Sequence, residues 1–262
     1  MRLEKDLVSI LQEVHTKNIL IADIGNSNTK FSCFDRVFFS IEELKDFISA
    51  NYDSELKFEV FIFSTVENKS LLIKSELESE LAVENCHIFK AQEQKIITNL
   101  YEGIGNDRVA KLIGAQKLYP GKNIILVDFG TATTINIVSK DSEFIGGFIG
   151  LGFTSSLKAL SDYCDALEDY SHGKFIYENS YRDIEAQDSK KAIINGTINA
   201  HMGLVNQWLY KARNLLKEKL YLTENTITIC TGGDASLFIK YFDCFLYDYE
   251  LLDACVDALS ES

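Results

Sequence analysis

Two short segments, far apart in the chain, carry the same pattern. In Ile21–Lys30, an apolar stretch runs into Asp23-Ile24-Gly25 and then into small polar residues. Leu126–Thr134 repeats this order, with Asp128-Phe129-Gly130 followed mostly by threonines. Glycine permits a tight turn and a close approach of the backbone to an anion, and exposed backbone amides hold phosphate groups. The repeat therefore predicts two strand–turn–strand hairpins that hold the phosphates of a nucleotide from two sides.

The two aspartates predict cation binding rather than direct contact with phosphate. A carboxylate repels phosphate, but it can hold a divalent cation, usually through water, that bridges the phosphate groups. We therefore expect Asp23 and Asp128 each to hold a cation. An ordinary hairpin turn is the alternative for Asp23, and a threonine-rich strand end is the alternative for Asp128. The presence of both copies favours the phosphate-binding interpretation.

A third segment, Gly103-Ile104-Gly105-Asn106-Asp107-Arg108, lies between the two hairpins. Its glycines bring a loop close to a ligand just before a helix begins. Phosphorylation of an alcohol needs a carboxylate within hydrogen-bond reach of the hydroxyl group, and Asp107 can supply it. Arg108 can pair with a substrate carboxylate through two hydrogen bonds. The alternative role for Asp107 is that of a helix N-cap, and the two roles are compatible.

A fourth segment, Thr231-Gly232-Gly233-Asp234-Ala235, follows an apolar strand and precedes a helix. Two adjacent glycines leave a flat wall without side chains, on which an adenine ring can lie. An ordinary strand–helix turn is the alternative, because a Gly-Gly pair alone carries little information. We expect Gly232 and Gly233 to contact the nucleotide.

Composition limits the partners and the compartment. The 262 residues carry a net charge of −13, which argues against a nucleic acid or an anionic membrane as partner, since both require clustered Lys and Arg. The six cysteines include no Cys-x-x-Cys pair, so we expect free thiols in a reducing cytoplasm, with Cys33, Cys164 and Cys230 buried. Charges among the first six residues argue against a signal peptide, and no apolar run reaches the ~18 residues that span a membrane.

The order of apolar and turn segments predicts an α/β protein with two lobes. Residues 1–17 form an amphipathic helix, residues 18–119 the first lobe and residues 120–262 the second, with Pro120-Gly121 as the junction. Each lobe has a β-β-β-α-β-α character. We expect strands over 19–22, 58–63, 87–89, 123–127, 134–138, 143–147 and 226–230, two more that contain Phe31, Cys33, Phe38 and Phe39, and helices over 41–50, 67–81, 106–119, 154–168 and 188–218.

In this order, the four segments resemble the type III pantothenate kinases of bacterial coenzyme A synthesis. The most specific element is Gly105-Asn106-Asp107-Arg108 followed by Val109-Ala110 and Gly114-Ala115, and Asp128–Thr134 and Gly146-Gly147 reinforce it. The resemblance implies the fold of the actin/Hsp70/sugar-kinase superfamily, which has two ribonuclease-H-like lobes with mixed sheets and the nucleotide in the cleft between them. It implies ATP-dependent phosphorylation of pantothenate to 4′-phosphopantothenate by a homodimer.

The resemblance also assigns roles to individual residues. Asp107 is the base that takes the proton from the primary hydroxyl group of pantothenate, and Asp128 is the ligand of a monovalent cation, K⁺ or NH₄⁺. Asp23 lies in the first phosphate loop, near the Mg²⁺ of ATP. The residues expected to bind pantothenate are Gly105, Asn106, Asp107, Arg108 and Ser189. Those expected to contact ATP are Asp23, Ile24, Gly25, Asn26, Ser27, Asn28, Thr29, Lys30 and Thr131.

The chain departs from the family pattern at three places. The usual Tyr-x-x-Pro before the Gly-x-Asp-Arg motif corresponds to Thr98 and Tyr101, Leu151 stands where the family has proline, and residues 1–17 are an extension. Two other functions remain alternatives at this point. One is a kinase of a sugar or another small alcohol, and the other is a non-catalytic regulator that responds to nucleotides.

Overall fold

The computed structural model describes residues 18–25, 28–52, 56–64, 66–172, 184, 186–220, 225–247 and 250–261. The predicted helix over 1–17 therefore lies outside the described residues. The described residues form two compact units. The first contains those up to Gln94 together with Glu102–Ala110, and the second contains Lys95–Tyr101 and those from Lys111 onward. A division at Pro120-Gly121 stays a prediction.

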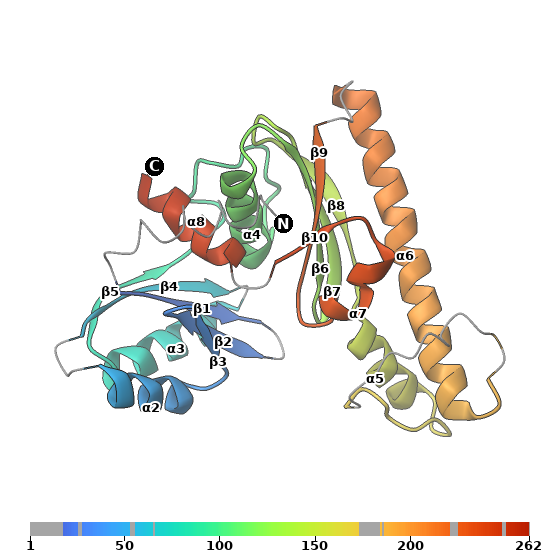
Figure 1. The fold of residues 1–262 in the computed structure, drawn as a ribbon, viewed down its shortest axis with the longest axis horizontal. Helices are drawn as coiled ribbons and strands as arrows, with labels where there is room; N and C mark the ends of the chain where they lie inside the picture. Colours follow the sequence, from blue (N-terminus) through green and yellow to red (C-terminus); the bar gives the residue numbers. More distant parts are fainter. Residues whose placement is uncertain are drawn as a thin grey trace. The chain divides into compact units, whose positions relative to one another are not determined.

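The first unit is a five-stranded mixed sheet with the strand order β3-β2-β1-β4-β5 (Figure 1). The central strand β1 pairs antiparallel with β2 and parallel with β4, and β4 pairs parallel with β5. Its elements are β1 (Ile19–Ile24), β2 (Thr29–Cys33), β3 (Arg36–Phe38), α2 (Ile41–Asn51), β4 (Phe58–Ser64), α3 (Glu67–Glu80) and β5 (Val83–Ile88).

The start of α2 follows from local sequence. The hydroxyl group of Ser40 accepts a hydrogen bond from the backbone N–H of Glu43 (3.1 Å), and the Glu43 carboxylate accepts one from the N–H of Phe39 (2.9 Å). Such reciprocal bonds satisfy N–H groups that a helix leaves unpaired at its start. The predicted helix is confirmed. The placement of Phe39 in a strand was wrong, because this residue belongs to the capping segment and is exposed.

One face of the first sheet forms the core of this unit. Leu20, Ala22 and Ile24 of β1 are buried in one cluster with Leu44 of α2 and Leu77 of α3. Side chains alternate between the two faces of a strand. Asp23 therefore projects from the face of β1 that α2 and α3 do not cover.

The second unit repeats this topology. Its strand order is β10-β9-β6-β7-β8, in which the central β6 pairs antiparallel with β7 and parallel with β9. Its elements are β6 (Asn123–Phe129), β7 (Ala132–Val138), β8 (Phe144–Leu151), α5 (Phe153–Tyr163), α6 (Ser189–Leu220), β9 (Thr226–Thr231), α7 (Ala235–Phe238), β10 (Phe245–Leu246) and α8 (Glu250–Glu261). The predicted pair of ribonuclease-H-like sheets is confirmed.

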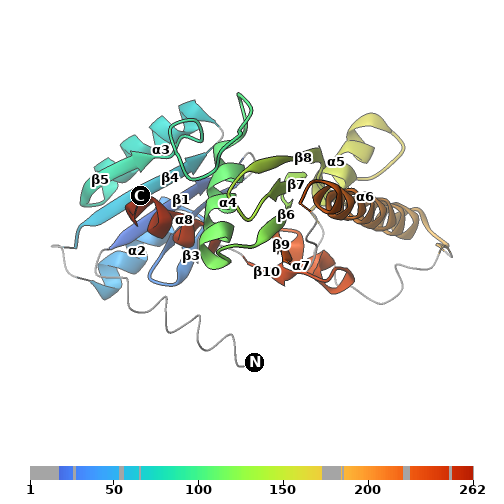
Figure 2. The same ribbon diagram turned by 90° about the horizontal axis from the view of Figure 1, so that it is seen from above.

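Helices lie on both faces of the second sheet. Val127 and Phe129 of β6 pack in one buried cluster with residues of α5, α6 and α7, and Figure 2 shows α5 and α6 on the same side of the sheet. Asp128 alternates to the opposite face, where it contacts Lys111 of α4 (Asn106–Leu118). Helix α8 packs on α4, since the backbone of Leu251 lies directly against Gly114.

Most predicted elements are present, and their ends moved where local signals were weak. Helix α5 ends at Tyr163 rather than at residue 168, and β5 begins at Val83 rather than at residue 87. In the part of the chain that the structure describes, no helix is both long and apolar enough to cross a membrane.

Gly114 tests the packing of α8 on α4. A β-carbon at this position would lie 1.7 Å from the carbonyl oxygen of Leu251, so Gly114→Ala forces backbone to move. We expect a loss of roughly 1–3 kcal/mol in the free energy of unfolding, measured by chemical denaturation. The control is Gly203→Ala in α6, where nothing lies within 4 Å. Alanine favours helix there by up to ~1 kcal/mol, and equal effects of the two changes would contradict this packing.

Candidate functional site

The first Asp-x-Gly segment forms the predicted hairpin at the end of the central strand. Asp23 and Ile24 end β1, and Thr29 and Lys30 begin β2, with Asp23 opposite Lys30 in the register. The backbone N–H of Gly25 donates to the carbonyl oxygen of Asn28 (2.9 Å), next to the last register pair, Ile24 and Thr29. Ile24 is buried in the core, so only its backbone is available to a ligand. The predicted ATP contacts Asn26 and Ser27 lie outside the described residues.

The start of α4 is attached to the same end of this sheet. The Asn106 side chain donates to the carbonyl oxygen of Ser64 (2.8 Å) and accepts from the backbone N–H of Ala91 (2.8 Å). Ser64 is the last residue of β4 and the register partner of Ile24 in β1. The structure therefore brings Gly105–Arg108 to the sheet edge that carries the Asp23 hairpin. The side-chain amide of Asn106 is therefore used for this attachment.

Asp107 follows Asn106 in the first turn of α4. Its Oδ1 atom is buried and, among the described residues, has no hydrogen-bond partner. A buried carboxylate oxygen is normally hydrogen-bonded, because removal from water without a partner is costly. This atom is therefore suited to receive a hydrogen bond from a bound hydroxyl group. The adjacent Arg108 is buried as well.

The second Asp-x-Gly segment also forms a hairpin at the end of a central strand, but its aspartate has a charged partner. Lys111 Nζ donates to Asp128 Oδ2 at 2.7 Å. The side chains of Lys111 and Asp128 are only 11% and 13% exposed. Gly232, at the end of the neighbouring β9, lies against the other carboxylate oxygen. A β-carbon there would come within 2.4 Å of Asp128 Oδ1, and the φ of +98° also favours glycine.

Two further contacts hold the loops around Asp128. The N–H of Gly152, the residue before α5, donates to the carbonyl oxygen of Thr131 (3.0 Å), while the Thr131 side chain is exposed. The N–H of Asp234 donates to the carbonyl oxygen of Phe129 (3.0 Å). The structure thus brings together Asp128, Thr131 and Gly232 at one edge of the second sheet, and Gly233 lies next to them and is exposed.

Asp234 is a buried acid that the sequence interpretation did not select. Its carboxylate accepts hydrogen bonds from the hydroxyl group of Thr154 (3.0 and 3.1 Å) and from the N–H of Thr154 (3.3 Å). Burial raises the pKa of Asp234 above its ordinary value, and the bonds from Thr154 oppose this effect. Asp234 thereby ties the β9–α7 loop to the first turn of α5.

Ser189, the predicted pantothenate contact of the second unit, is the exposed first residue of α6. Asp188 accepts a hydrogen bond from the N–H of Lys191 (2.8 Å) and so caps this helix. Further along, residues of α5, α6 and β8 line an open apolar hollow of about 780 Å³. Its lining includes Leu151 and His201 but not Ser189.

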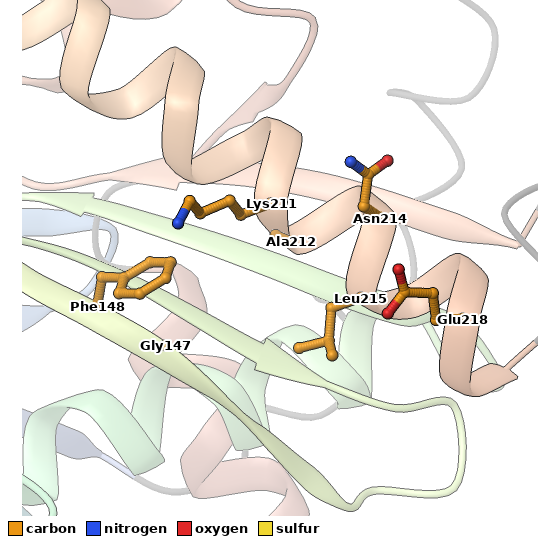
Figure 3. Close-up of a pocket in the computed structure, with 7 residues that line it drawn as sticks. All are labelled: Gly147, Phe148, Lys211, Ala212, Asn214, Leu215 and Glu218. Atoms are coloured by element: carbon orange, nitrogen blue, oxygen red, sulfur yellow. The ribbon is translucent and has the colours of Figure 1, made fainter.

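A second hollow lies on the other half of α6. Its lining, labelled in Figure 3, comprises Gly147 and Phe148 of β8 and Lys211, Ala212, Asn214, Leu215 and Glu218 of α6. The aromatic ring of Phe148 stacks on Trp208 with 5.5 Å between ring centroids. Gly150 leaves room for Trp208, because a β-carbon there would lie 2.9 Å from its ring. Strand β8 therefore lines both hollows along α6.

Within the described ranges, no group of three or more His, Cys, Asp or Glu side chains is arranged to hold a metal ion. All six cysteines are free thiols, as expected. Cys33 and Cys230 are buried, but the prediction of a buried Cys164 was wrong because it follows the end of α5 and is exposed.

The sequence interpretation missed Lys111, Gly152 and Asp234. Gly152 ends the glycine-rich β8 segment, whose pattern matched the family despite Leu151 in place of proline, but no role was assigned to Gly152 itself. Lys111 lies inside the motif that begins at Gly105, but its partner Asp128 is 17 residues further along the chain. A contact between residues so far apart in the chain cannot be recognised from a local sequence pattern.

Two units with one ribonuclease-H-like topology, each with an Asp-x-Gly hairpin at the end of its central strand, define an actin-like ATPase fold. The family model of the type III pantothenate kinases matches residues 19–211, and the chain belongs to this family.

Individual relatives agree with this membership. The type III pantothenate kinase of Elusimicrobium minutum is 31% identical over 151 residues, which cover 57% of this chain and 55% of that protein. Type III pantothenate kinase 1 of Francisella tularensis subsp. holarctica is 33% identical over 147 residues, or 55% and 54% of the two chains. The chain thus spans about half the length of these relatives. With the type III pantothenate kinase of Aquifex aeolicus, it shares 24% identity over 85% of this chain and 89% of that protein.

One solved structure supports the fold alone. A Campylobacter jejuni protein described as a Baf family transcriptional activator superposes with a TM-score of 0.55. It is 23% identical, and the superposition covers 92% of this chain and 98% of that one.

His201 gives a pH test of the second unit. The buried ring contacts the Thr133 hydroxyl (3.0 Å), and burial lowers its pKa from 6.5 to about 4. Between these values the unfolded chain binds a proton that the native chain does not, so the His201 contribution to stability falls as pH falls from 6.5 to 4. The full loss is roughly 3 kcal/mol.

We expect His201→Gln to flatten the dependence of the unfolding free energy on pH between 4.5 and 6.5. His172→Gln is the matched control, because the His172 side chain is 88% exposed. Chemical denaturation at several pH values checks this. Parallel profiles for the wild type and His201→Gln would contradict a depressed pKa.

Proposed function

We propose that this chain phosphorylates pantothenate with ATP and forms 4′-phosphopantothenate, the first step of coenzyme A biosynthesis. Membership of the type III pantothenate kinase family supports the reaction and both substrates. The observation that carries the proposal is the buried Asp107 Oδ1, which has no hydrogen-bond partner among the described residues and lies at the same end of the sheet as the Asp23 hairpin. A base and a phosphate-binding turn at one edge are what transfer from ATP to an alcohol requires.

In this proposal Asp107 is the catalytic base. It accepts a hydrogen bond from the primary hydroxyl group of pantothenate and takes its proton as the hydroxyl oxygen attacks the γ-phosphorus. The bond from the γ-phosphorus to the oxygen that bridges it to the β-phosphate breaks, and ADP leaves with that oxygen. Arg108 pairs with the pantothenate carboxylate through two hydrogen bonds. Asn106 acts by position, because its amide holds the loop to Ser64. The backbone of Gly105 and the hydroxyl group of Ser189 complete the proposed pantothenate contacts.

The proposed ATP contacts come from three turns. The first turn supplies Asp23, Ile24, Gly25, Asn26, Ser27, Asn28, Thr29 and Lys30, in which Ile24 takes part through its backbone. Thr131 in the second hairpin and Gly232 and Gly233 after β9 supply the others. The exposure of Thr131 and Gly233 supports their access to a ligand. Most of the rate acceleration would then come from positioning and charge stabilisation.

A kinase on this fold uses a divalent metal that arrives with ATP, and we propose Mg²⁺. The half-buried Asp23 fits a metal that keeps most of its water and phosphate ligands, which is the usual behaviour of Mg²⁺. When bound, the metal neutralises charge on the phosphates. The resemblance also implies K⁺ or NH₄⁺ at Asp128, but the Lys111 ammonium group already contacts that carboxylate. The donor set at Asp128 therefore does not fit a second cation, and no step is assigned to one.

We further propose that the active species is a cytoplasmic homodimer with small-molecule partners only. Free thiols fit a reducing compartment, and the net charge of −13 argues against nucleic acids and anionic membranes. β8 is an edge strand of its sheet. It exposes Ile149 (60%) and Leu151 (52%), and such apolar edges are commonly covered by a partner.

Asp107 tests the catalytic proposal. We expect Asp107→Asn to lower turnover by about 10²–10⁴-fold, because the amide cannot accept the proton. The assay measures ADP release in the presence and in the absence of pantothenate. Mass spectrometry identifies the phosphorylated product. Asp46→Asn, the same change at an exposed site on α2, is expected to retain full turnover. Near-normal turnover of a folded Asp107→Asn variant would remove Asp107 from this role, and pantothenate-independent ADP release would refute the substrate.

Ile149 tests the dimer. We expect the wild type to sediment at twice the protomer mass of 29.6 kDa and Ile149→Glu to shift toward the protomer, because a buried carboxylate without a partner disfavours association. Leu72→Glu on α3 is the control, since Leu72 is also exposed (69%) but belongs to the first unit and is not part of β8. A wild type that sediments as a single protomer at micromolar concentration would refute the proposal.

A further inference from the structure

We infer that the ammonium group of Lys111 takes the place of the monovalent cation at Asp128, so that this chain needs neither K⁺ nor NH₄⁺. The inference deepens the proposed function, because it concerns the cation requirement of the same site. It rests on the environment of the Asp128 carboxylate.

One oxygen of this carboxylate is hydrogen-bonded to Lys111, and the space beside the other is restricted by Gly232. Oδ2 accepts a hydrogen bond from Lys111 Nζ at 2.7 Å, a length typical of a bond between two charged groups. Oδ1 lies beside Gly232, so close that a β-carbon at this glycine would be 2.4 Å from it. The side chains of Lys111 and Asp128 are both largely removed from water. A free ion would have to displace Lys111 or bind beside a positive charge.

The chemistry of the lysine head group matches that of the ion it would replace. NH₄⁺ and the lysine ammonium group both place one positive charge and N–H donors on a carboxylate. The lysine is tethered by the helix α4, so its local concentration does not depend on the medium. Like charges a few ångströms apart in a site with little water repel strongly, and this repulsion excludes a second monovalent cation.

The competing interpretation is an ion pair that only stabilises the fold. If the ion pair only stabilises the fold, removal of the Lys111 charge has no consequence for ion binding. If Lys111 replaces a cation, removal of its charge leaves a site that a free cation can occupy. Lys111→Met removes the ammonium group and keeps an unbranched side chain of similar length. Lys117→Met is the matched control, because Lys117 lies on the same helix and pairs with Glu261 at an exposed site.

The first measurements use the wild-type protein. Turnover and the thermal midpoint of unfolding are compared in KCl, NH₄Cl and choline chloride at equal ionic strength. We expect turnover to agree within twofold and the midpoint to show no specific effect of K⁺. Crystals soaked in Tl⁺, which mimics K⁺, are expected to show no anomalous scattering peak at Asp128. A tenfold or larger stimulation by K⁺, or a Tl⁺ peak at Asp128, would overturn the inference even if no variant folds.

The second measurements use the variants. For Lys111→Met we expect K⁺ or NH₄⁺, but not choline, to raise the thermal midpoint, and Tl⁺ to appear beside Asp128. Turnover in choline chloride should fall at least tenfold and recover in part with KCl. Lys117→Met should behave as the wild type. A folded Lys111→Met variant with no response to K⁺ and no Tl⁺ site would also overturn the inference. The thermal and Tl⁺ readouts need no pantothenate, so they separate this inference from a failure of the proposed reaction.

Discussion

The burial of one residue in each hairpin, Ile24 in the first unit and Phe129 in the second, sets the geometry of the sites. Each side chain is held in the core on one face of its sheet. Because neighbours along a strand point to opposite faces, Asp23 and Asp128 must project from the other face. The glycine that follows then turns the chain beside the carboxylate. In an Asp-x-Gly pattern at the end of a central strand, the aspartate thus supplies the functional group, the middle residue anchors the strand in the core, and the glycine makes the turn.

The two copies use this frame differently. In the first unit, Asn106 attaches the start of α4 to the end of β4, which leaves the carboxylate of Asp107 buried at the sheet edge. In the second unit, the aspartate of the hairpin is itself engaged by Lys111 and shielded by Gly232. The two sheets share one topology, but their hairpin ends therefore differ. The end of the first sheet is suited to proton transfer at Asp107, whereas at the end of the second sheet the charge of Asp128 is neutralised by Lys111. The symmetry of the sheets does not extend to their chemistry.

The sequence was sufficient where a structural signal is local. Ser40 and Glu43 predicted the start of α2, and the hairpins predicted the central strand ends. It was insufficient for β5, whose first residues are largely exposed and lack the apolar run of a buried strand. The environment of Asp128 could not be predicted either. Its partners come from α4 and from the turn after β9, and only the folded chain brings these segments to one place.

The contact between Lys111, Asp128 and Gly232 also restricts how this chain can evolve. Loss of either charge alone breaks a buried ion pair, and any side chain at residue 232 collides with the carboxylate. Single substitutions at these three positions are therefore expected to be destabilising even where a combined change would be tolerated. We expect the three residues to vary together among descendants of this chain. The exception is a lineage that comes to depend on a free ion, which could change Lys111 alone while it kept both Asp128 and Gly232.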